Sequence, residues 1–448
     1  MVKRTSPRRT RGPLRKQKTD EKALSTSHQA QNSNRAALRD NPLQIVGLGP
    51  APERLAPEEL DVLRRADILA GGRELLQPFS DRGVELLPLR TPLSEWIGEI
   101  VSRLEQGSQV VVLADGDPLF YGIGIRLCRE LGPDAVRVHP GVSVLQAAAA
   151  KLGLSWGDIA TVSLHGREDL LPLRRALAQN ERVGVYTDPE NTPGRIAAFL
   201  TGIGAHDFRV HVLENLFRER ERISAHSPEQ AADRSFDEPN FVLLERTHPP
   251  RVPPTPGMPK ESLQRERGLI SKPEVRLAAL GRLRPESDHI LWDIGAGSGS
   301  LALEASFFIR SGRILAVERE EARKAQIEAN IANTGAFGVE AMQGAAPDCF
   351  PHLPDPDRIF LGGGTGQGGD LLDRAWSRLK PGGRLVASLV LLGSLQTVLD
   401  WARNMGLEPE LTQIQVNRST PIREDIRLAA QNPVFLLSLD KPFEGDTP

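Results

Sequence analysis

"LWDIGAGSGSLALEAS", residues 291–306, decides the fold of the C-terminal half of this chain. The apolar run that begins the stretch predicts a buried strand, and the Ala- and Leu-rich run that ends it predicts a helix. Between them Gly295, Gly297 and Gly299 stand at every second position, and Asp293 precedes them. Because glycine has no Cβ, a ligand can approach such a turn closely. The sequence therefore predicts a binding site where this strand meets this helix.

The spacing of these glycines separates the ligand classes that use such turns. A dinucleotide fingerprint places its third glycine where this chain has Ser300, which argues against an NAD-dependent oxidoreductase without eliminating it. A nucleotide P-loop is excluded, since no Gly-Lys-Ser/Thr follows. Glu318 ends the next predicted strand, at the place where a carboxylate can accept hydrogen bonds from both hydroxyls of a ribose.

Strands and helices alternate through the rest of this half. The predicted strands are 289–295, 312–320, 357–364 and 384–392, and the predicted helices are 298–310, 321–335 and 369–383. This order favours a parallel sheet covered by helices, a Rossmann-like α/β fold. In such sheets ligands bind at the carboxyl ends of the strands, where the glycine turn lies.

A second glycine-rich turn, "IVGLGPAPERL", lies near the other end of the chain. It follows a predicted strand and contains Gly49 and Pro50. Further along, "VVVLADGDPLFYGIGIRL" predicts a strand that ends in Gly116-Asp117-Pro118, and "VRVHPGVSVLQ" predicts another strand and turn. Glycine removes the Cβ and proline fixes the bend, so these turns also suit a ligand close to the backbone.

The chain divides into two unrelated halves. Its first 40 residues are basic and polar and predict a disordered tail, and residues 247–268 are rich in proline and predict a connector. These limits leave two predicted domains, 41–246 and 269–445. The halves share no motif beyond their glycine turns, which indicates a fusion and not a duplication.

Composition narrows the function classes. A net charge of −2 and a pI near 6.5 give no sign of nucleic acid or of an anionic membrane as partner. We expect no metal, because Cys128 and Cys349 stand alone and the nine histidines show no ligand spacing. No apolar run approaches a membrane span or a secretory signal, so we expect a cytoplasmic protein.

The motif D-x-G-x-G-x-G with Glu318 resembles the class I S-adenosylmethionine-dependent methyltransferases. Together with "GLISKPEVRLAALGRL", "GAAPDCF", "DRIFLGGG" and "LKPGGRLVAS", it is similar to the C15-methylating, decarboxylating precorrin methyltransferases over about residues 257–440. Gly362, Gly363 and Gly364 fit that family, whereas the C-terminal "IQVNRSTPIREDIRLAAQNPVFLLSLDKP" aligns only loosely.

The N-terminal turns resemble the tetrapyrrole methylases of the C5-methylating type, over about residues 43–246. The fusion of both halves is similar to the precorrin-6Y C5,15-methyltransferase (decarboxylating) family of cobalamin biosynthesis. The resemblance implies a two-lobed tetrapyrrole methylase fold followed by a Rossmann-like class I fold. It also implies methylation of C5 and C15 of precorrin-6B, or of its cobalt counterpart, with loss of the carboxyl of the ring C acetate to give precorrin-8X.

The resemblance also implies cofactors, partners and binding residues. Each half would bind S-adenosylmethionine, which is consumed as the methyl donor, and the substrate would be a tetrapyrrole. A homo-oligomer is expected on the resemblance alone. The implied donor-binding residues are Gly49, Pro50, Gly116, Asp117 and Pro118 in the first half, and Asp293, Gly295, Gly297, Gly299 and Glu318 in the second.

Methyl transfer between a sulfonium and an electron-rich ring carbon requires alignment more than an activated nucleophile, so no proton-transfer residue is assigned. The substrate carries several carboxylates, which Arg and Lys bind well. Lys272 and Arg276, four residues apart before the donor turn, are the candidate contacts. Tyr121 and His165 fit family motifs as pocket-lining residues. A non-catalytic tetrapyrrole- or nucleotide-binding module remains an alternative.

Overall fold

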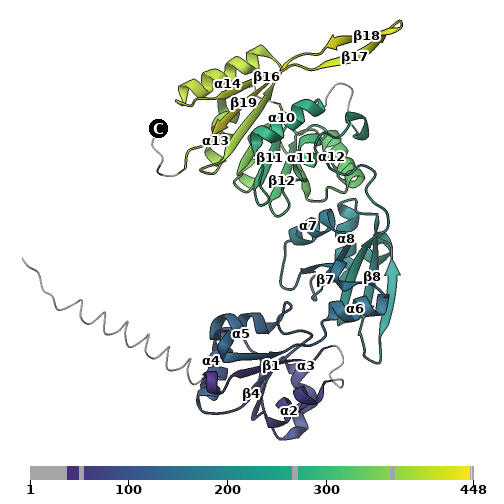
Figure 1. Cartoon of the computed structure of the whole chain (residues 1–448), viewed down its shortest axis with the longest axis vertical. Helices are drawn as coiled ribbons and strands as arrows, with labels where there is room; N and C mark the ends of the chain where they lie inside the picture. The colour runs from purple at the N-terminus through teal and green to yellow at the C-terminus, as the bar shows by residue number, and fades with distance from the viewer. Residues whose placement is uncertain (1–37, 50–54, 265–270, 364–368, 444, 446–448) are drawn as a thin grey trace, which may run out of the picture. The chain divides into compact units, whose positions relative to one another are not determined.

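The computed structural model describes residues 38–49, 55–264, 271–363, 369–443 and 445. They form two compact units, whose elements are labelled in Figure 1. The first unit runs to Trp156 and includes Asn215–Glu221; the second contains Gly157–Glu214 and the chain from Arg222 onward. The boundary near residue 157 therefore falls inside the predicted domain 41–246.

A five-stranded parallel sheet, in the order β3-β2-β4-β1-β5, forms the centre of the first unit. Leu43 and Ile45 on one face of β1 and Val46 on the other are all buried, as expected of a parallel sheet covered on both faces. The strands are β1 (Leu43–Gly47), β2 (Ile68–Gly71), β3 (Glu85–Pro88), β4 (Val110–Ala114) and β5 (Val136–His139). The helices are α2 (Pro57–Arg65), α3 (Arg73–Leu76), α4 (Leu93–Glu105), α5 (Ile123–Leu131) and α6 (Val144–Leu152).

The ordered part of this unit begins earlier than predicted. Residues 1–37 of the predicted tail lie outside the described residues, but residues 38–40 are helical. Leu38 is buried in the same apolar cluster as Leu43, because the short stretch before β1 supplies one large apolar side chain to that cluster. The predicted tail of 40 residues is therefore too long at its C-terminal end.

The second unit contains a mixed five-stranded sheet, in the order β6-β7-β10-β8-β9. Strands β6 and β7 are parallel, and the pairings of β10 with β7 and β8, and of β8 with β9, are antiparallel. The strands are β6 (Ala160–Ser163), β7 (Arg182–Tyr186), β8 (Phe208–Glu214), β9 (Arg222–His226) and β10 (Asn240–Arg246), and the helices are α7 (Leu171–Gln179), α8 (Pro193–Gly202) and α9 (Pro228–Ala232). We call this part, residues 157–214 and 222–246, the β6–β10 lobe.

The C-terminal part of the second unit is a seven-stranded sheet, in the order β13-β12-β11-β14-β15-β19-β16. Only β19 runs antiparallel to its neighbours β15 and β16. The strands are β11 (Ile290–Ile294), β12 (Arg313–Glu318), β13 (Val339–Gln343), β14 (Arg358–Leu361), β15 (Arg384–Leu389), β16 (Glu410–Ile414) and β19 (Val434–Asp440). The helices are α10 (Pro273–Leu283), α11 (Ser300–Ala305), α12 (Glu321–Thr334), α13 (Gly369–Arg378) and α14 (Leu392–Asn404).

Alternate residues of these strands enter two separate apolar clusters. Leu291 packs with α10, α11 and α12, whereas its neighbour Trp292 packs with α13 and α14 on the opposite face. This alternation follows from the two-residue period of a strand. Helices on both faces leave the ends of the parallel strands as the place where loops can form a site.

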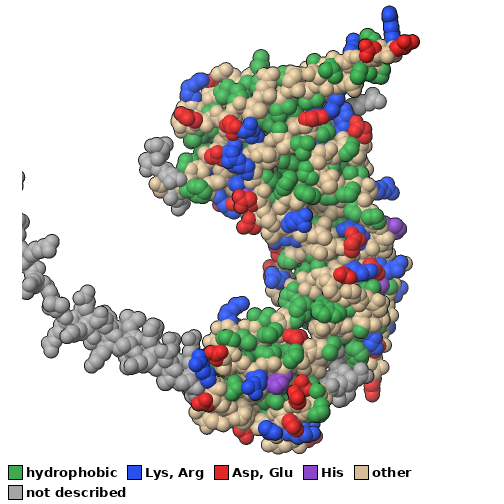
Figure 2. Space-filling view, viewed as in Figure 1, with side chains coloured by type: hydrophobic (Ala, Val, Ile, Leu, Met, Phe, Trp, Pro, Cys, Tyr) green, Lys and Arg blue, Asp and Glu red, His purple; other side chains and the backbone are tan. Residues whose placement is uncertain are grey.

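A two-stranded hairpin, β17 (Asn417–Ile422) and β18 (Asp425–Ala430), is inserted between β16 and β19. Its apolar side chains are unusually exposed, Ile426 by 67% and Leu428 by 72%. Charged side chains gather at its tip in Figure 2. The hairpin and strand β19 both lie in the C-terminal stretch, residues 414–442, that aligned only loosely with the family.

The predicted connector is packed and not free. Met258 and Leu263 are buried in the apolar cluster that contains the strands of the seven-stranded sheet. The prediction of an extended spacer over 247–268 is therefore wrong for its described part, because its few apolar side chains find a core to enter. Residues 265–268 lie outside the described ranges.

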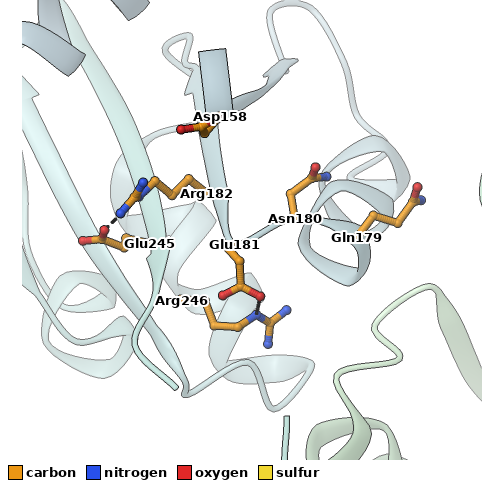
Figure 3. Close-up of a pocket in the computed structure, with 7 residues that line it drawn as sticks. All are labelled: Asp158, Gln179, Asn180, Glu181, Arg182, Glu245 and Arg246. Atoms are coloured by element: carbon orange, nitrogen blue, oxygen red, sulfur yellow. Dashed lines mark hydrogen bonds and ion pairs between the residues drawn. The ribbon is translucent and has the colours of Figure 1, made fainter. Parts of the chain in front are cut away.

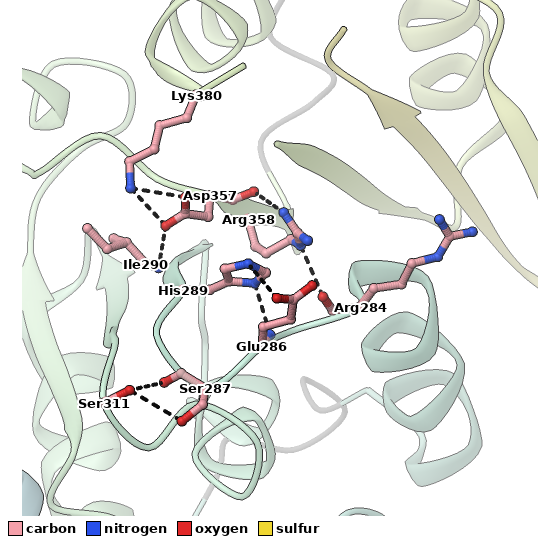
Figure 4. Close-up of polar contacts among 9 residues, drawn as sticks. All are labelled: Arg284, Glu286, Ser287, His289, Ile290, Ser311, Asp357, Arg358 and Lys380. Atoms are coloured by element: carbon pink, nitrogen blue, oxygen red, sulfur yellow. Dashed lines mark hydrogen bonds and ion pairs between the residues drawn. The ribbon is translucent and has the colours of Figure 1, made fainter. Parts of the chain in front are cut away.

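The amino ends of the sheet are closed by polar contacts, shown in Figure 4. The Asp357 carboxylate accepts hydrogen bonds from Ile290 N at 2.8 Å and from Lys380 Nζ at 2.9 Å. His289 Nδ1 accepts from Glu286 N at 2.9 Å. These bonds satisfy polar groups at the amino ends of the strands. The carboxyl ends of the strands are therefore the place left for a ligand.

No helix within the described ranges is long and apolar enough to cross a membrane.

Candidate functional site

The glycine turn after β11 has the backbone that only glycine adopts easily. Gly295, Gly297 and Gly299 have φ of +71°, +58° and +73°, in the left-handed region where a side chain is strained. A Cβ on Gly299 would also lie 3.0 Å from Cγ2 of Ile327 on α12. The three glycines therefore let the chain turn from β11 into α11 while α12 packs closely against it.

Asp293 lies one residue before the end of β11 and is 1% exposed. Its Oδ2 accepts a hydrogen bond from Ala302 N at 3.2 Å, whereas its Oδ1 has no hydrogen-bond partner among the described residues. Burial, together with the nearby Glu318 carboxylate, raises the pKa of Asp293 to about 7, although the hydrogen bond from Ala302 N lowers it. A buried polar atom without a partner is rare in a folded protein, so Oδ1 is suited to a donor group on a ligand.

Glu318 ends β12 beside the same turn and is 6% exposed. Its Oε2 accepts from Gly297 N at 2.9 Å, and its Oε1 accepts from Arg319 N at 2.9 Å. The carboxylate is thus held against the glycine turn by main-chain donors, at the position where the sequence predicts a ribose acceptor. Its contact with a ribose stays a prediction.

These residues line a cavity of about 910 Å³ at the carboxyl ends of β11, β12, β14 and β15. Gly362 and Gly363 also line it, and Gly364 lies outside the described residues. The segment 344–348, quoted above only for its resemblance, forms part of the wall. Ser388 and Asn432 line the cavity without having been predicted, because no local pattern marks two polar residues separated by over forty positions.

Asn330, on α12, is a further residue that the sequence reasoning missed. Its side chain is fully buried and donates from Nδ2 to Ser298 O in the glycine turn at 2.9 Å. It also donates to Gln264 O at 2.9 Å and accepts from Gln264 N at 2.8 Å. The side-chain amide of Asn330 thus joins the glycine turn after β11 to the connector. An asparagine in an "EANIAN" helix carries no sequence signal of that role.

The two predicted substrate contacts separate in the structure. Lys272 is half-buried, lines the cavity and donates from Nζ to Asn432 O at 2.6 Å. Arg276 is fully buried and pairs with Glu304, whose side chain is also fully buried, at 2.6 Å. Its guanidinium also donates to Ser271 O at 2.6 Å and to Met258 O. The prediction that Arg276 binds a substrate carboxylate is therefore wrong, because its donors are engaged inside the core.

In the first unit, the turns that follow β1, β4 and β5 meet at one end of the sheet. A Cβ on Gly47 would lie 2.5 Å from Gly116 O and 2.6 Å from Gly141 N. No side chain fits in such a space, so the glycines allow three backbones to pack together. The third predicted turn, represented by Gly141, belongs to this site although it was not among the predicted binding residues.

The predicted donor residues of this unit lie at that junction. Gly49 and Gly116 have φ of +64° and +60°. Asp117 Oδ1 accepts from Leu119 N at 2.8 Å and so fixes the turn that contains Pro118. Pro50 lies outside the described residues. Donor binding by these residues stays a prediction.

Tyr121 and His165 fall in different units. Tyr121 follows this turn in the first unit, has a φ of +57° and is 49% exposed. His165 follows β6 in the second unit and is exposed. A pocket-lining role for either residue stays a prediction.

Comparisons with known proteins agree with the two halves. A model described as tetrapyrrole (corrin/porphyrin) methylases matches residues 42–232, and a model described as precorrin methyltransferase domain matches residues 263–441. With the sheet orders and glycine turns above, these matches define the class: a methyltransferase with a tetrapyrrole methylase fold followed by an S-adenosylmethionine-dependent methyltransferase fold. The predicted fold class is confirmed. We call residues 263–441 the class I domain.

Relatives along most of the chain define the family. A precorrin-6Y C(5,15)-methyltransferase (decarboxylating) of Sinorhizobium sp is 33% identical over 382 residues, 84% of this chain and 89% of the relative. The chain belongs to the precorrin-6Y C5,15-methyltransferase (decarboxylating) family. The cobalt-precorrin-7 C(5)-methyltransferase of Salmonella typhimurium is 36% identical over 204 residues, 45% of this chain and 98% of the relative. The solved C-terminal domain of precorrin-6Y C5,15-methyltransferase from Rhodobacter capsulatus is 32% identical, covers 42% of this chain and 99% of that one, and has a TM-score of 0.38.

Proposed function

We propose that this chain transfers two methyl groups, to C5 and C15 of a precorrin-6 macrocycle or its cobalt counterpart, and decarboxylates the ring C acetate. The N-terminal half would methylate C5, and the class I domain would methylate C15 and release carbon dioxide. The observation that supports the proposal is the presence, in one chain of this family, of glycine-rich turns at the strand ends of two separate parallel sheets, with a cavity at the second of them.

The class I cavity suits S-adenosylmethionine. Asp293 Oδ1 is a buried acceptor that lacks a partner among the described residues, as an ammonium group requires. Gly295 and Gly297 present bare backbone to the same cavity, and Glu318 supplies a carboxylate at its wall. The donor supplies a methyl group on a positively charged sulfur. The role of these residues is to fix its orientation toward the ring carbon.

The decarboxylation balances without a further reactant. Transfer of CH₃⁺ to C15 breaks the bond from sulfur to carbon and leaves one positive charge in the conjugated ring. Loss of CO₂ from the acetate of ring C then returns the electron pair of the broken carbon–carbon bond to that ring. A proton shift from the ring converts the exocyclic CH₂ to methyl. The cavity has to orient the ring and its carboxylates, and Lys272 on the cavity wall is the remaining candidate contact.

The direct test incubates the full chain with isotopically labelled S-adenosylmethionine and precorrin-6B, metal-free or loaded with cobalt. Mass spectrometry should find two added methyl groups, and headspace analysis should find one carbon dioxide per macrocycle. Binding of the donor with no methyl transfer to either form would contradict the proposal and favour a binding module instead.

Two variants test which half of the chain transfers which methyl group. Gly297→Val places a β-branched residue at a φ of +58° beside the class I cavity and should abolish the C15 methyl while leaving the C5 methyl. Gly116→Val, at a φ of +60°, should do the reverse. The matched controls are Gly281→Ala in α10 and Gly98→Ala in α4, since a Cβ at either place meets open space. A folded Gly297→Val protein that keeps the C15 methyl and loses the C5 one would refute this assignment.

A further inference from the structure

Helix α7 of the β6–β10 lobe places polar side chains against the class I domain. Arg174 Nη1 donates to Phe337 O at 3.1 Å and to Val339 O at 2.9 Å. Arg175 Nε donates to Gly312 O at 3.0 Å, and Gln179 Nε2 donates to Arg310 O at 2.8 Å. All four acceptors are main-chain carbonyls of the class I domain.

Two of these acceptors lie where neighbouring strands of that domain begin. Val339 begins β13, the edge strand of the seven-stranded sheet, and Gly312 directly precedes β12. An exposed sheet edge presents unsatisfied backbone groups and invites pairing with other chains. Arg174 therefore covers the start of this edge with a charged donor, and Arg175 satisfies a carbonyl next to it.

Arg246 completes the contact at the end of β10. Its side chain is 3% exposed, and its guanidinium lies 4.5 Å from the ring centroid of Phe208 and 5.6 Å from that of Phe337. Phe208 belongs to the lobe and Phe337 to the class I domain. Nη1 pairs with Asp207 and Nη2 donates to Leu177 O at 2.7 Å, so the cation is held from the lobe side. Figure 3 shows Arg246 beside Glu181 of the lobe, whose Oε1 lies 3.8 Å from its Nε.

Apolar packing between the two parts is equally close. Leu173, Leu177 and Ala205 of the lobe belong to one continuous buried cluster with Ala336 and Phe337 of the class I domain. A Cβ on Gly204 would lie 2.9 Å from Cβ of Ala332. Such a distance leaves no layer of water between the lobe and α12. The contact has the buried core and polar margin of a stable protein interface.

We propose that this face of the β6–β10 lobe is a docking surface for the class I domain, and that it holds the two halves together without help from the connector. The partner it fits is the start of the β13 edge strand, with the loop 335–338, of the class I domain. The proposal goes beyond the proposed function, because it depends on no substrate. It predicts that the two pieces of the chain stay bound to each other after the connector is cut.

The connector offers a place to cut. Thr255 is exposed and lies before the buried Met258, so a recognition sequence for a site-specific protease can be inserted after it without entering the core. Cleavage of the folded full chain should give two pieces that co-elute in size-exclusion chromatography at the volume of the uncut chain. Native mass spectrometry should find both pieces in one complex. Two separate peaks at micromolar concentration would overturn the proposal.

Substitutions in the cleavable chain test the residues. Arg246→Ala removes the shared cation and should make the cut pieces separate. Arg182→Ala is the matched control: Arg182 bonds Glu245 at 2.9 Å on the same sheet, as Figure 3 shows, and has no bond to the class I domain among the described contacts. Ala332→Gln adds bulk opposite Gly204 with a good helix former, so the separate domains should still fold.

Circular dichroism of the uncut variants checks that each protein is folded. We expect dissociation of the cut Arg246→Ala and Ala332→Gln proteins at a concentration at least tenfold above that at which the cut Arg182→Ala protein dissociates. Equal dissociation of all three would show that these residues do not form the docking surface, and would overturn the assignment.

Discussion

The buried ion pair of Arg276 and Glu304 allows a test of whether Arg276 stabilises the core or binds a substrate carboxylate. Both side chains are fully buried, and Arg276 Nε and Nη2 both contact Glu304 Oε1, at 2.7 Å and 2.6 Å. The pair joins α10 to α11, directly behind the donor turn. We predict that Arg276→Met, which keeps the volume but removes the charge, destabilises the second unit without acting on the substrate.

The magnitude follows from the environment of the charge left behind. Removing one partner of a buried ion pair costs about 3–5 kcal/mol, because the other charge stays buried without compensation. Replacing both partners by apolar residues of similar volume is often close to neutral. The buried carbonyl of Met258 loses its donor in either case, at a cost of about 1–3 kcal/mol, whereas the carbonyl of the exposed Ser271 can bind water instead. The double variant Arg276→Met/Glu304→Leu should therefore be more stable than the single one, by about 2 kcal/mol or more.

Urea unfolding followed by tryptophan fluorescence measures this difference, since Trp292, Trp376 and Trp401 all lie in the class I domain. The midpoint of the transition should fall strongly for Arg276→Met and recover in part in the double variant. Folded Arg276→Met protein should keep the KM of the parent for the tetrapyrrole. An unchanged midpoint with a raised KM would refute the reasoning and restore Arg276 as a substrate contact.

Three further predictions concern the two sites. Asp293 keeps its proton in the folded chain up to about pH 7 but ionises near 3.8 when unfolded, so stability should fall as pH rises between these values and then level off; thermal unfolding from pH 4 to 8 should show this slope in the parent and not in Asp293→Asn. Asn330→Ala should raise the Kd of the class I site for S-adenosylhomocysteine about tenfold in calorimetry, whereas Asn333→Ala, on the same helix, should not. Gly47→Ala places a Cβ 2.5 Å from Gly116 O and should lower the unfolding midpoint of the first unit, whereas Gly98→Ala should leave it unchanged or higher.

Local patterns determined the elements of the fold. The period of apolar residues predicted β11, α11 and β12, because a strand buried on both faces reads as a continuous apolar run. Glycine at every second position marked the turn, because left-handed φ values are costly for other residues. The family resemblance rested on these same local features, and the matches along the chain confirm it.

Contacts between distant segments were decided only by the tertiary structure. Arg276 and Lys272 look equivalent in sequence, yet Arg276 faces the core, where it pairs with Glu304 on α11, and Lys272 faces the cavity. The spacing of residues along the chain does not show that Glu304 lies opposite Arg276. Arg246 looks like the end of a strand, and Asn330 like a polar position on a helix. Each acquires its partner from a segment tens of residues away, and pairing over such separations depends on how the elements pack and not on the sequence around either residue.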